Sequence, residues 1–162
     1  MDTYLAIASK RDERRYADAP VPDDVVTRIL DAGRLAGSSK NQQARRFVVV
    51  EDAEARRGVA EAVYAPANVQ GAALVVAIIG KSGFDVGRAA QNMMLAAWND
   101  GVVSCPNGIR DAERAAGIFG ETPAIVLSFG YPARRRDPEA RTAEEWSARA
   151  NRSPLAELVN RL

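Results

Sequence analysis

The chain has 162 residues, of which 47% are hydrophobic and 27% charged, a composition typical of one globular domain with a sizeable core. It contains no histidine and one cysteine, which excludes Ser-His and Cys-His catalysis, histidine-ligated zinc and an internal disulfide. Its 22 basic and 21 acidic residues leave a net charge of +1, which argues against general nucleic-acid binding. No apolar run reaches the ~20 residues of a membrane span, and no signal-peptide pattern is present, so we expect a cytoplasmic protein without a membrane partner.

Helical spacing and turn residues predict the elements of the first half of the chain. A short helix over residues 3–9 leads into a basic segment, and a second helix follows the proline-rich turn and ends at Gly37. Apolar runs predict buried strands over 45–52 and 73–80, with a helix over 54–64 between them. The stretch from Pro66 to Gly71 is expected to be irregular.

The second half begins with a long helix that starts near Asp85 and ends at Gly101, with apolar residues in a three-four rhythm. Residues 102–105 predict a short strand that leads into a turn at Pro106, Asn107 and Gly108. A helix over 111–118 and a strand over 124–130 follow, and the tail, 131–162, has no continuous core pattern. Strands separated by helices predict a mixed α/β or α+β fold, and no linker divides two domains.

Three polar segments are candidates for binding chemistry. The basic run KRDERRY (10–16) can bind a phosphate through charge-assisted hydrogen bonds, the alternative being a solvated turn. The loop SSKNQQ (38–43) offers donors and acceptors that suit the rim of a heteroaromatic ring, the alternative being a polar loop after a helix cap. The segment SCPNGI (104–109) can present backbone N–H groups to a ligand, the alternative being an ordinary turn.

Taken together, these segments resemble the nitroreductase family of FMN-dependent NAD(P)H oxidoreductases. The basic run is similar to the family pattern R-R-S-x-R-x-F, and AGSSKNQQARRFVVV (36–50) is similar to A-P-S-x-x-N-x-Q-P-W-x-F. The segments DVGRAAQNMMLAAWNDGVVSCPNG (85–108), AIVLSFGYPARRR and NRSPLAELV resemble the family's central helix, last core strand and C-terminal arm. The resemblance covers nearly the whole chain in the family's order.

The resemblance implies an α+β fold with a mixed central sheet flanked by helices, in an intertwined homodimer with two FMN sites. It implies one FMN-binding domain over residues 1–162, whose C-terminal arm (about 131–162) packs on the partner subunit. The long helix from Asp85 would form the dimer core, and no metal is expected. Carried over by position, the residues that would bind FMN are Lys10, Arg11, Asp12, Arg14, Ser38, Ser39, Asn41, Gln43, Pro106, Asn107, Gly108 and Arg152.

Each group has a role implied by the family. Lys10, Arg11, Arg14 and Arg152 would bind the phosphate and ribityl chain, with Arg14 also near N1 and O2 of the ring. Ser38, Ser39 and Asn41 would reach the flavin of the partner subunit, and Gln43 would support their loop. Asn107 and Gly108 would offer N–H groups toward N5. No catalytic side chain is required, because the chemistry occurs at flavin N5.

The implied function is hydride transfer from NADH or NADPH to FMN in a ping-pong cycle, followed by electron transfer to a nitroaromatic, quinone or similar small acceptor. Two alternatives remain: a flavin-binding dimer without turnover, and a flavin-fragmenting enzyme resembling dimethylbenzimidazole synthase, in which an aspartate also occurs at the position of Asp12. Ala44-Arg45 stands where the family has P-W, which predicts a looser loop. The short link between the strand at 73–80 and the next helix predicts an open site, because the usual helical insertion is missing.

Overall fold

The computed structural model describes residues 1–162, which form two compact units. The larger unit, Arg11–Arg136, contains the whole sheet; the smaller unit combines Met1–Lys10 with Asp137–Leu162. Each unit has its own set of elements. No helix is long and apolar enough to cross a membrane.

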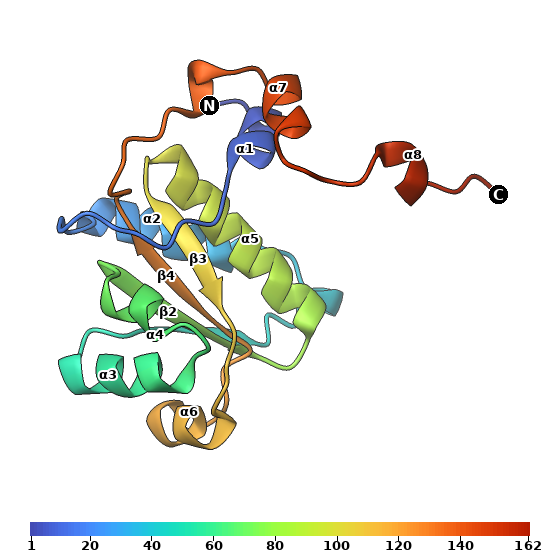
Figure 1. Cartoon of the computed structure of the whole chain (residues 1–162). Coiled ribbons are helices and arrows are strands. Elements are labelled where there is room, and N and C mark those ends of the chain that lie inside the picture. The colour runs from blue at the N-terminus through green and yellow to red at the C-terminus, as the bar shows by residue number, and fades with distance from the viewer. The chain divides into compact units, whose positions relative to one another are not determined.

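Four strands and five α-helices build the larger unit (Figure 1). The strands are β1 (Arg45–Val49), β2 (Leu74–Gly80), β3 (Val103–Asn107) and β4 (Ile125–Gly130). The helices are α2 (Asp23–Arg34), α3 (Ala53–Ala62), α4 (Pro66–Gln70), α5 (Gly83–Asn99) and α6 (Ala112–Phe119), and a 3-10 turn, η1, spans Ser39–Asn41.

The sheet has the strand order β1-β2-β4-β3, and every strand pairing is antiparallel. Strands β2 and β3 run in the same direction and are joined by α5, as in a βαβ unit, but β4 lies between them. This insertion explains why the sheet differs from the predicted mixed sheet: the two co-directional strands are not neighbours. The α+β class is confirmed, and the only parallel pairing is an isolated bridge between Asp12 and Ser104.

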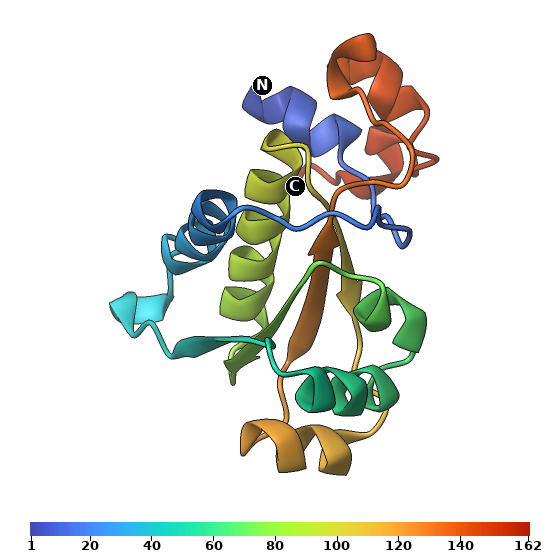
Figure 2. The same ribbon diagram turned by 90° about the vertical axis from the view of Figure 1, so that its left-hand side faces the viewer.

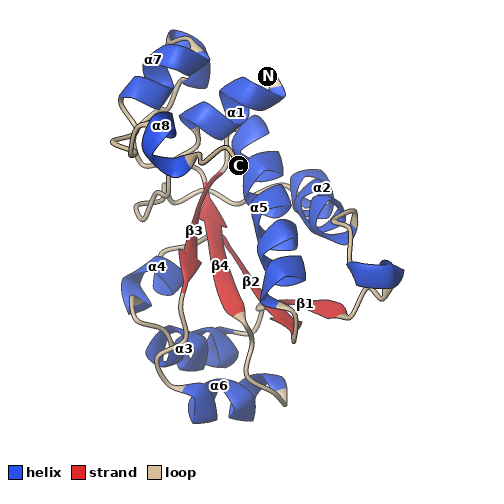
Figure 3. Ribbon diagram, turned by 90° about the vertical axis from the view of Figure 1, so that its right-hand side faces the viewer, coloured by secondary structure: helices blue, strands red, loops and turns tan.

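The sheet is covered on both faces, as Figure 3 shows with α2 and α5 on one side and α3 and α4 on the other. Alternation along β2 divides the core accordingly, because successive side chains of a strand point to opposite faces. Leu74, Val76 and Ile78 pack in a cluster with α2 and α5, whereas Val75 and Ala77 pack in a cluster with α3 and α4. Burial on both faces explains why β2 is an almost unbroken apolar run.

Local signals explain most helix boundaries. Asp52, Ser82 and Asp111 cap α3, α5 and α6 by accepting hydrogen bonds from backbone N–H groups of the first turn. Helix α6 ends at Gly120, whose φ of 81° lies in the left-handed region that favours glycine. Helix α2 ends at Arg34, three residues before the predicted end at Gly37.

Two further predictions in this unit, both about local structure, are wrong. Residues 66–70, expected to be irregular, form α4, because Pro66 occupies the first helical position, where its missing N–H costs nothing. Pro106 and Asn107, expected in a turn, continue β3 and pair with Leu127 and Val126 of β4. A proline is tolerated there because β3 is an edge strand.

The smaller unit contains α1 (Thr3–Ser9), α7 (Ala143–Ala148) and α8 (Leu155–Leu158), with a 3-10 turn, η2, at Pro138–Ala140. Asp2 caps α1, and Trp146 Nε1 donates to the carbonyl of Pro138 at 2.7 Å. Helix α7 was not predicted, although Thr142 and Glu145 form a capping box at its start. Helix α8 lies in the segment that resembles the family's C-terminal arm, and its apolar residues are exposed.

Candidate functional site: a basic segment beside an edge strand

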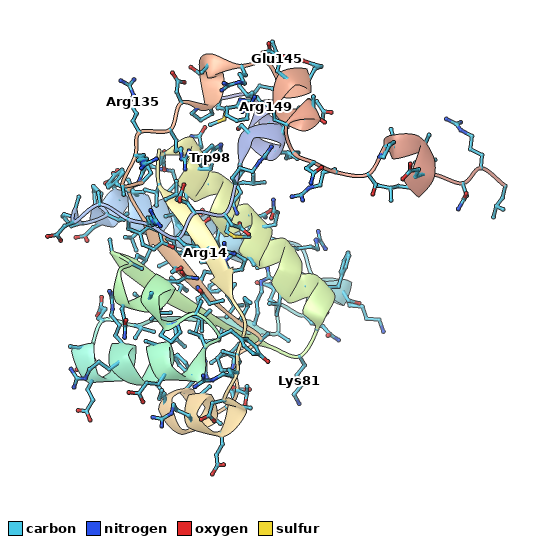
Figure 4. The ribbon with its side chains drawn as sticks, in the orientation of Figure 1. Arg14, Lys81, Trp98, Arg135, Glu145 and Arg149 are labelled. Carbon is cyan, nitrogen blue, oxygen red and sulfur yellow. The ribbon has the colours of Figure 1, made fainter.

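Residues 11–16 of the basic run belong to the larger unit, where the segment pairs with β3. Asp12 forms a parallel bridge with Ser104, and the N–H of Glu13 donates to the Ser104 carbonyl at 3.0 Å. The segment therefore contacts β3 at Ser104, three residues before Asn107. Asn107 is the last residue of β3 and one of the predicted flavin-binding residues. Arg14 is exposed, and Figure 4 draws it over β3. The structure thus brings two of the predicted binding groups, 11–14 and 106–108, to the same edge of the sheet.

The other predicted residues are not brought to this edge. Ser38, Ser39, Asn41 and Gln43 lie in the loop that precedes β1, the strand at the opposite edge of the sheet (Figure 2). Lys10 and Arg152 belong to the smaller unit, where Lys10 follows α1 and Arg152 is exposed. The larger unit therefore carries two separate parts of the predicted site, one at the β3 edge of the sheet and one at the β1 edge.

Asn107 is the most constrained of the predicted residues, because its side chain is buried in a polar network. Its Nδ2 donates to the Cys105 carbonyl at 3.0 Å and to Ser128 Oγ at 3.0 Å, and it lies 3.2 Å from the Val126 carbonyl. Its Oδ1 accepts from Asn68 Nδ2 at 2.8 Å. The side chain is therefore fixed inside the protein, and only backbone groups of this strand end remain to face a ligand.

Ser128 joins this network to the basic segment. Its hydroxyl lies 2.8 Å from the hydroxyl of Tyr16, the last residue of the basic run, and 3.2 Å from the Cys105 carbonyl, to which it donates. Burial raises the pKa of Tyr16 to about 12, more than the hydrogen bond to Ser128 lowers it. We call Tyr16, Asn68, Asn107 and Ser128 the polar network; it holds the basic run and the strand end on one framework.

Asn68 and Ser128 were not predicted as site residues. Ser128 lies in the apolar run of β4 and Asn68 in the segment expected to be irregular, so neither stands out in the sequence. For Ser128, the only available signal is that it is a polar residue inside an apolar strand. Such a residue is expected to have a hydrogen-bond partner, because buried polar groups are almost always hydrogen-bonded. Such a signal says that a partner exists but does not identify it.

The loop before β1 has an unusual backbone. Lys40, Asn41 and Gln43 adopt φ values of 50°, 53° and 51°, a conformation that costs non-glycine residues energy. Ser38 Oγ accepts from the Gln43 N–H at 2.8 Å, which closes the loop. Clustered left-handed residues of this kind occur at binding sites, where surrounding structure fixes them.

Arg45, which stands where the family pattern has tryptophan, anchors the end of this loop. Its guanidinium donates to the carbonyls of Arg34 (3.2 Å) and Ala36, at the C-terminus of α2, where a cation is favourable. The Nε and Nη1 atoms of Arg45 are buried without a hydrogen-bond partner, and the looser loop expected from the Ala44-Arg45 departure stays a prediction.

A hollow of about 600 Å³ opens beside this loop, within the size range of small-molecule sites. Leu35 and Gly37 line one side, and Phe84, Arg88 and Gln91 of α5 line the other. Phe84 is 75% exposed, and the Arg88 guanidinium lies 5.6 Å from the centre of its ring. Only two residues separate β2 from α5, so no inserted helix covers this side.

Comparison with known proteins identifies the family. The nitroreductase family model matches residues 7–83. The chain is 30% identical to a protein of Methanothermobacter thermautotrophicus that carries the provisional name NADH dehydrogenase/NAD(P)H nitroreductase, over 90% of this chain and 88% of that protein.

Two of the solved structures that are similar to this chain match almost its whole length. One is a provisionally named nitroreductase in complex with FMN from Desulfovibrio desulfuricans, with a TM-score of 0.80 at 26% identity, covering 100% of this chain and 98% of that one. The other, a nitroreductase family protein from Clostridium difficile 630, has a TM-score of 0.81 at 22% identity over 99% and 98% of the two chains and shows the shared fold. The chain belongs to the nitroreductase family.

Proposed function

We propose that the protein is an FMN-dependent oxidoreductase that takes hydride from NAD(P)H and passes the electrons to a nitroaromatic, quinone or similar small acceptor. The observation that carries this proposal is the bridge between Asp12 and Ser104, which sets the arginines of the basic run beside the strand that ends at Asn107. The FMN complex of the Desulfovibrio relative and the nitroreductase name of the Methanothermobacter relative support it.

The residues at this edge fit a flavin mononucleotide. Arg11 and Arg14 provide guanidinium groups, which match a phosphate with paired, charge-assisted hydrogen bonds. The buried Ser104 hydroxyl, where the segment crosses β3, has no hydrogen-bond partner in this chain. When bound, FMN supplies reversible hydride acceptance at N5.

Each residue then has a binding or positioning role. By the family resemblance, Lys10 and Arg152 would add charge for the phosphate, and Arg14 would also stabilise negative charge on the N1–O2 side of the ring. The exposed Gly108 presents its backbone toward N5, held in place by the buried Asn107 side chain. Asp12 lies beside this phosphate position and limits the net charge there.

We further propose that two copies complete each site. Ser38, Ser39, Asn41 and Gln43 lie at the edge opposite to Asn107, so in this arrangement they serve the flavin of a partner subunit. The chain would act as one FMN-binding domain with its C-terminal arm (131–162) packed on the partner and with α5 in the dimer core. Exposed apolar residues of the arm support this packing: Leu155, Leu158, Val159 and Leu162.

The decisive experiment is the visible absorption spectrum of the purified protein supplied with FMN, recorded before and after anaerobic addition of NADPH or NADH. We expect a protein-bound flavin spectrum that bleaches with the donor and returns when a quinone is added. A bound flavin that neither donor reduces would instead indicate a flavin-binding dimer without turnover. A modified flavin after exposure of the reduced protein to oxygen would indicate flavin fragmentation, and absence of bound flavin would refute the proposal.

A further inference from the structure

Two arginine-rich segments that are far apart in the sequence lie side by side in the larger unit. Tyr16 forms an antiparallel bridge with Pro132, the Ala17 N–H donates to the Tyr131 carbonyl at 2.8 Å, and the Ala133 N–H donates to the Arg15 carbonyl at 3.1 Å. An ion pair between Arg136 and Glu13 continues the pairing. The basic run is therefore joined to a second basic segment that the sequence places in the tail.

We call the arginines of these two segments the arginine patch: Arg11, Arg14, Arg15, Arg134, Arg135 and Arg136. With Asp12 and Glu13, the segments carry a net charge of +4, whereas the rest of the chain, with 16 basic and 19 acidic residues, carries −3. Arg14, Arg15, Arg134 and Arg135 are exposed and form no ion pair within the larger unit. The positive charge of this protein is thus concentrated at one place.

A flavin phosphate does not neutralise the patch. A phosphate monoester carries a charge of about −2 at pH 7, so a charge of about +2 remains after one such group has bound. In Figure 4, Arg14 is drawn over β3, whereas Arg135 points away from the ribbon. The two ends of the patch therefore reach different regions. Arg134 and Arg135, the outer arginines, are available to a second anion.

The size and charge of the patch favour a small phosphate compound over a nucleic acid. Nucleic-acid binding relies on a basic surface that follows many phosphates, and here the remainder of the chain is negatively charged. Two exposed arginines match a single phosphate monoester well, because each guanidinium can donate two parallel hydrogen bonds to its oxygens. The patch thus fits one additional dianion.

We propose that Arg134 and Arg135 bind a second phosphate monoester, the 2′-phosphate of NADPH, and so make NADPH the preferred donor. This inference rests on the proposed function, since it places the donor at the same site as the flavin. NADH lacks this phosphate and would leave the outer arginines without a ligand. Preference for NADPH is then a property of the segment after β4 and not of the flavin-binding residues.

The test compares two doubly substituted proteins with the same change in net charge. Arg134→Ala/Arg135→Ala removes the outer arginines, and Arg57→Ala/Lys81→Ala removes two exposed basic groups elsewhere; Figure 4 shows Lys81 pointing away from the protein. For FMN-loaded wild-type protein we expect kcat/KM for NADPH to exceed that for NADH by about tenfold or more. The outer-arginine variant should lose 10- to 100-fold with NADPH and less than threefold with NADH, while the control retains the preference.

A binding measurement without turnover accompanies the kinetics. Calorimetric titration of FMN-loaded protein should show tighter binding of adenosine 2′,5′-bisphosphate than of adenosine 5′-monophosphate, with the difference lost in the outer-arginine variant only. An unchanged difference in that variant, or an equal loss for both nucleotides, overturns the proposal. Inorganic phosphate as effective as the bisphosphate, or equally tight binding of an RNA oligonucleotide that also depends on Arg134 and Arg135, would assign the patch to another ligand and overturn it as well.

The outcome is separable from that of the proposed function. Flavin content and reduction by NADH test the oxidoreductase itself, and neither requires Arg134 or Arg135. Normal flavin reduction with no dependence on the 2′-phosphate refutes this inference alone.

Discussion

The two edges of the sheet are built in different ways, although both carry predicted flavin-binding residues. At the β3 edge, the polar network fixes Asn107 through hydrogen bonds of 2.8–3.0 Å to Asn68, Cys105 and Ser128, and all three partners are buried. At the β1 edge, the exposed 38–43 loop has one side-chain hydrogen bond, short-range backbone hydrogen bonds and three left-handed residues. Position is maintained by buried partners at one edge and by local backbone conformation at the other.

This difference indicates how each edge can respond to a ligand. A buried network resists displacement, because each broken hydrogen bond leaves an unpaired polar group that costs about 1–3 kcal/mol. An exposed loop with few contacts opens at low cost. We therefore expect the β3 edge to be formed before the flavin binds and the β1 loop to adjust to it.

The largest effect is expected for Asn107→Ala, which breaks the β3 edge. The substitution removes the group that pairs Asn68 and Ser128 and leaves a small cavity, so the free energy of unfolding should fall by about 3 kcal/mol. Denaturant unfolding followed by circular dichroism measures it. The matched control is Asn92→Ala, an exposed asparagine on α5 whose loss should cost less than about 0.5 kcal/mol; similar values for both would contradict a special role of the network.

Arg14→Ala tests the function of the same edge while leaving its framework intact. Loss of one charged contact to phosphate should weaken FMN binding by about 10- to 30-fold and slow flavin reduction, with little change in stability because Arg14 is exposed. Fluorescence titration of FMN gives the affinity. Arg57→Ala serves as the control, and equal flavin affinity in the two variants would remove Arg14 from the site.

Tyr16→Phe tests the β3 edge through the pH dependence of the free energy of unfolding. The variant loses the hydrogen bond to Ser128, at a cost of about 1 kcal/mol. The folded-state pKa of Tyr16 is raised to about 12 from an unfolded value of about 10. Its neutral form therefore stabilises the fold fully below pH 10, and this contribution declines as the pH rises toward 12. Unfolding measured from pH 9 to 11.5 should show a steeper loss in the wild type than in Tyr16→Phe; parallel curves would contradict the burial of this hydroxyl.

The smallest effect is expected at the β1 edge. Ser38→Ala removes the bond to the Gln43 N–H and should lower the free energy of unfolding by only about 0.5–1 kcal/mol, because the loop is exposed. Hydrogen exchange of the Gln43 amide should accelerate while exchange in β3 stays unchanged. Ser39→Ala, at a serine whose side chain has no such bond, is the control, and a loss as large as that of Asn107→Ala would erase the distinction between the edges.

Most of the fold could be predicted because its elements are specified locally. Apolar runs marked β1, β2 and β4, and a three-four rhythm of Val86, Ala89 and Met93 marked α5. Helix α7 was also specified locally, by the capping box at Thr142, but this signal was missed. The extension of β3 through Pro106 could not be predicted in the same way, since it depends on β3 being the edge strand.

The candidate site was predictable only in part, for a related reason. Its charged and polar residues stand out in the sequence, but the contacts that arrange them join distant segments. The bond between Tyr16 and Ser128 spans 112 positions, and the pairing of Arg15 with Ala133 has a comparable separation. Residue types can suggest what a segment binds, whereas long-range pairing decides which segments share a site.

The hydrogen bond from the Glu13 N–H to the Ser104 carbonyl has a further consequence for the behaviour of the protein at high concentration. An exposed edge strand offers unpaired N–H and C=O groups to strands of other molecules and so promotes aggregation. Along the outer side of β3, the Ser104 carbonyl is already occupied by the Glu13 N–H, and Pro106 has no N–H to offer. Residues that position the proposed FMN-binding segment thereby also keep further strands from pairing with β3, which favours a protein that does not aggregate when concentrated.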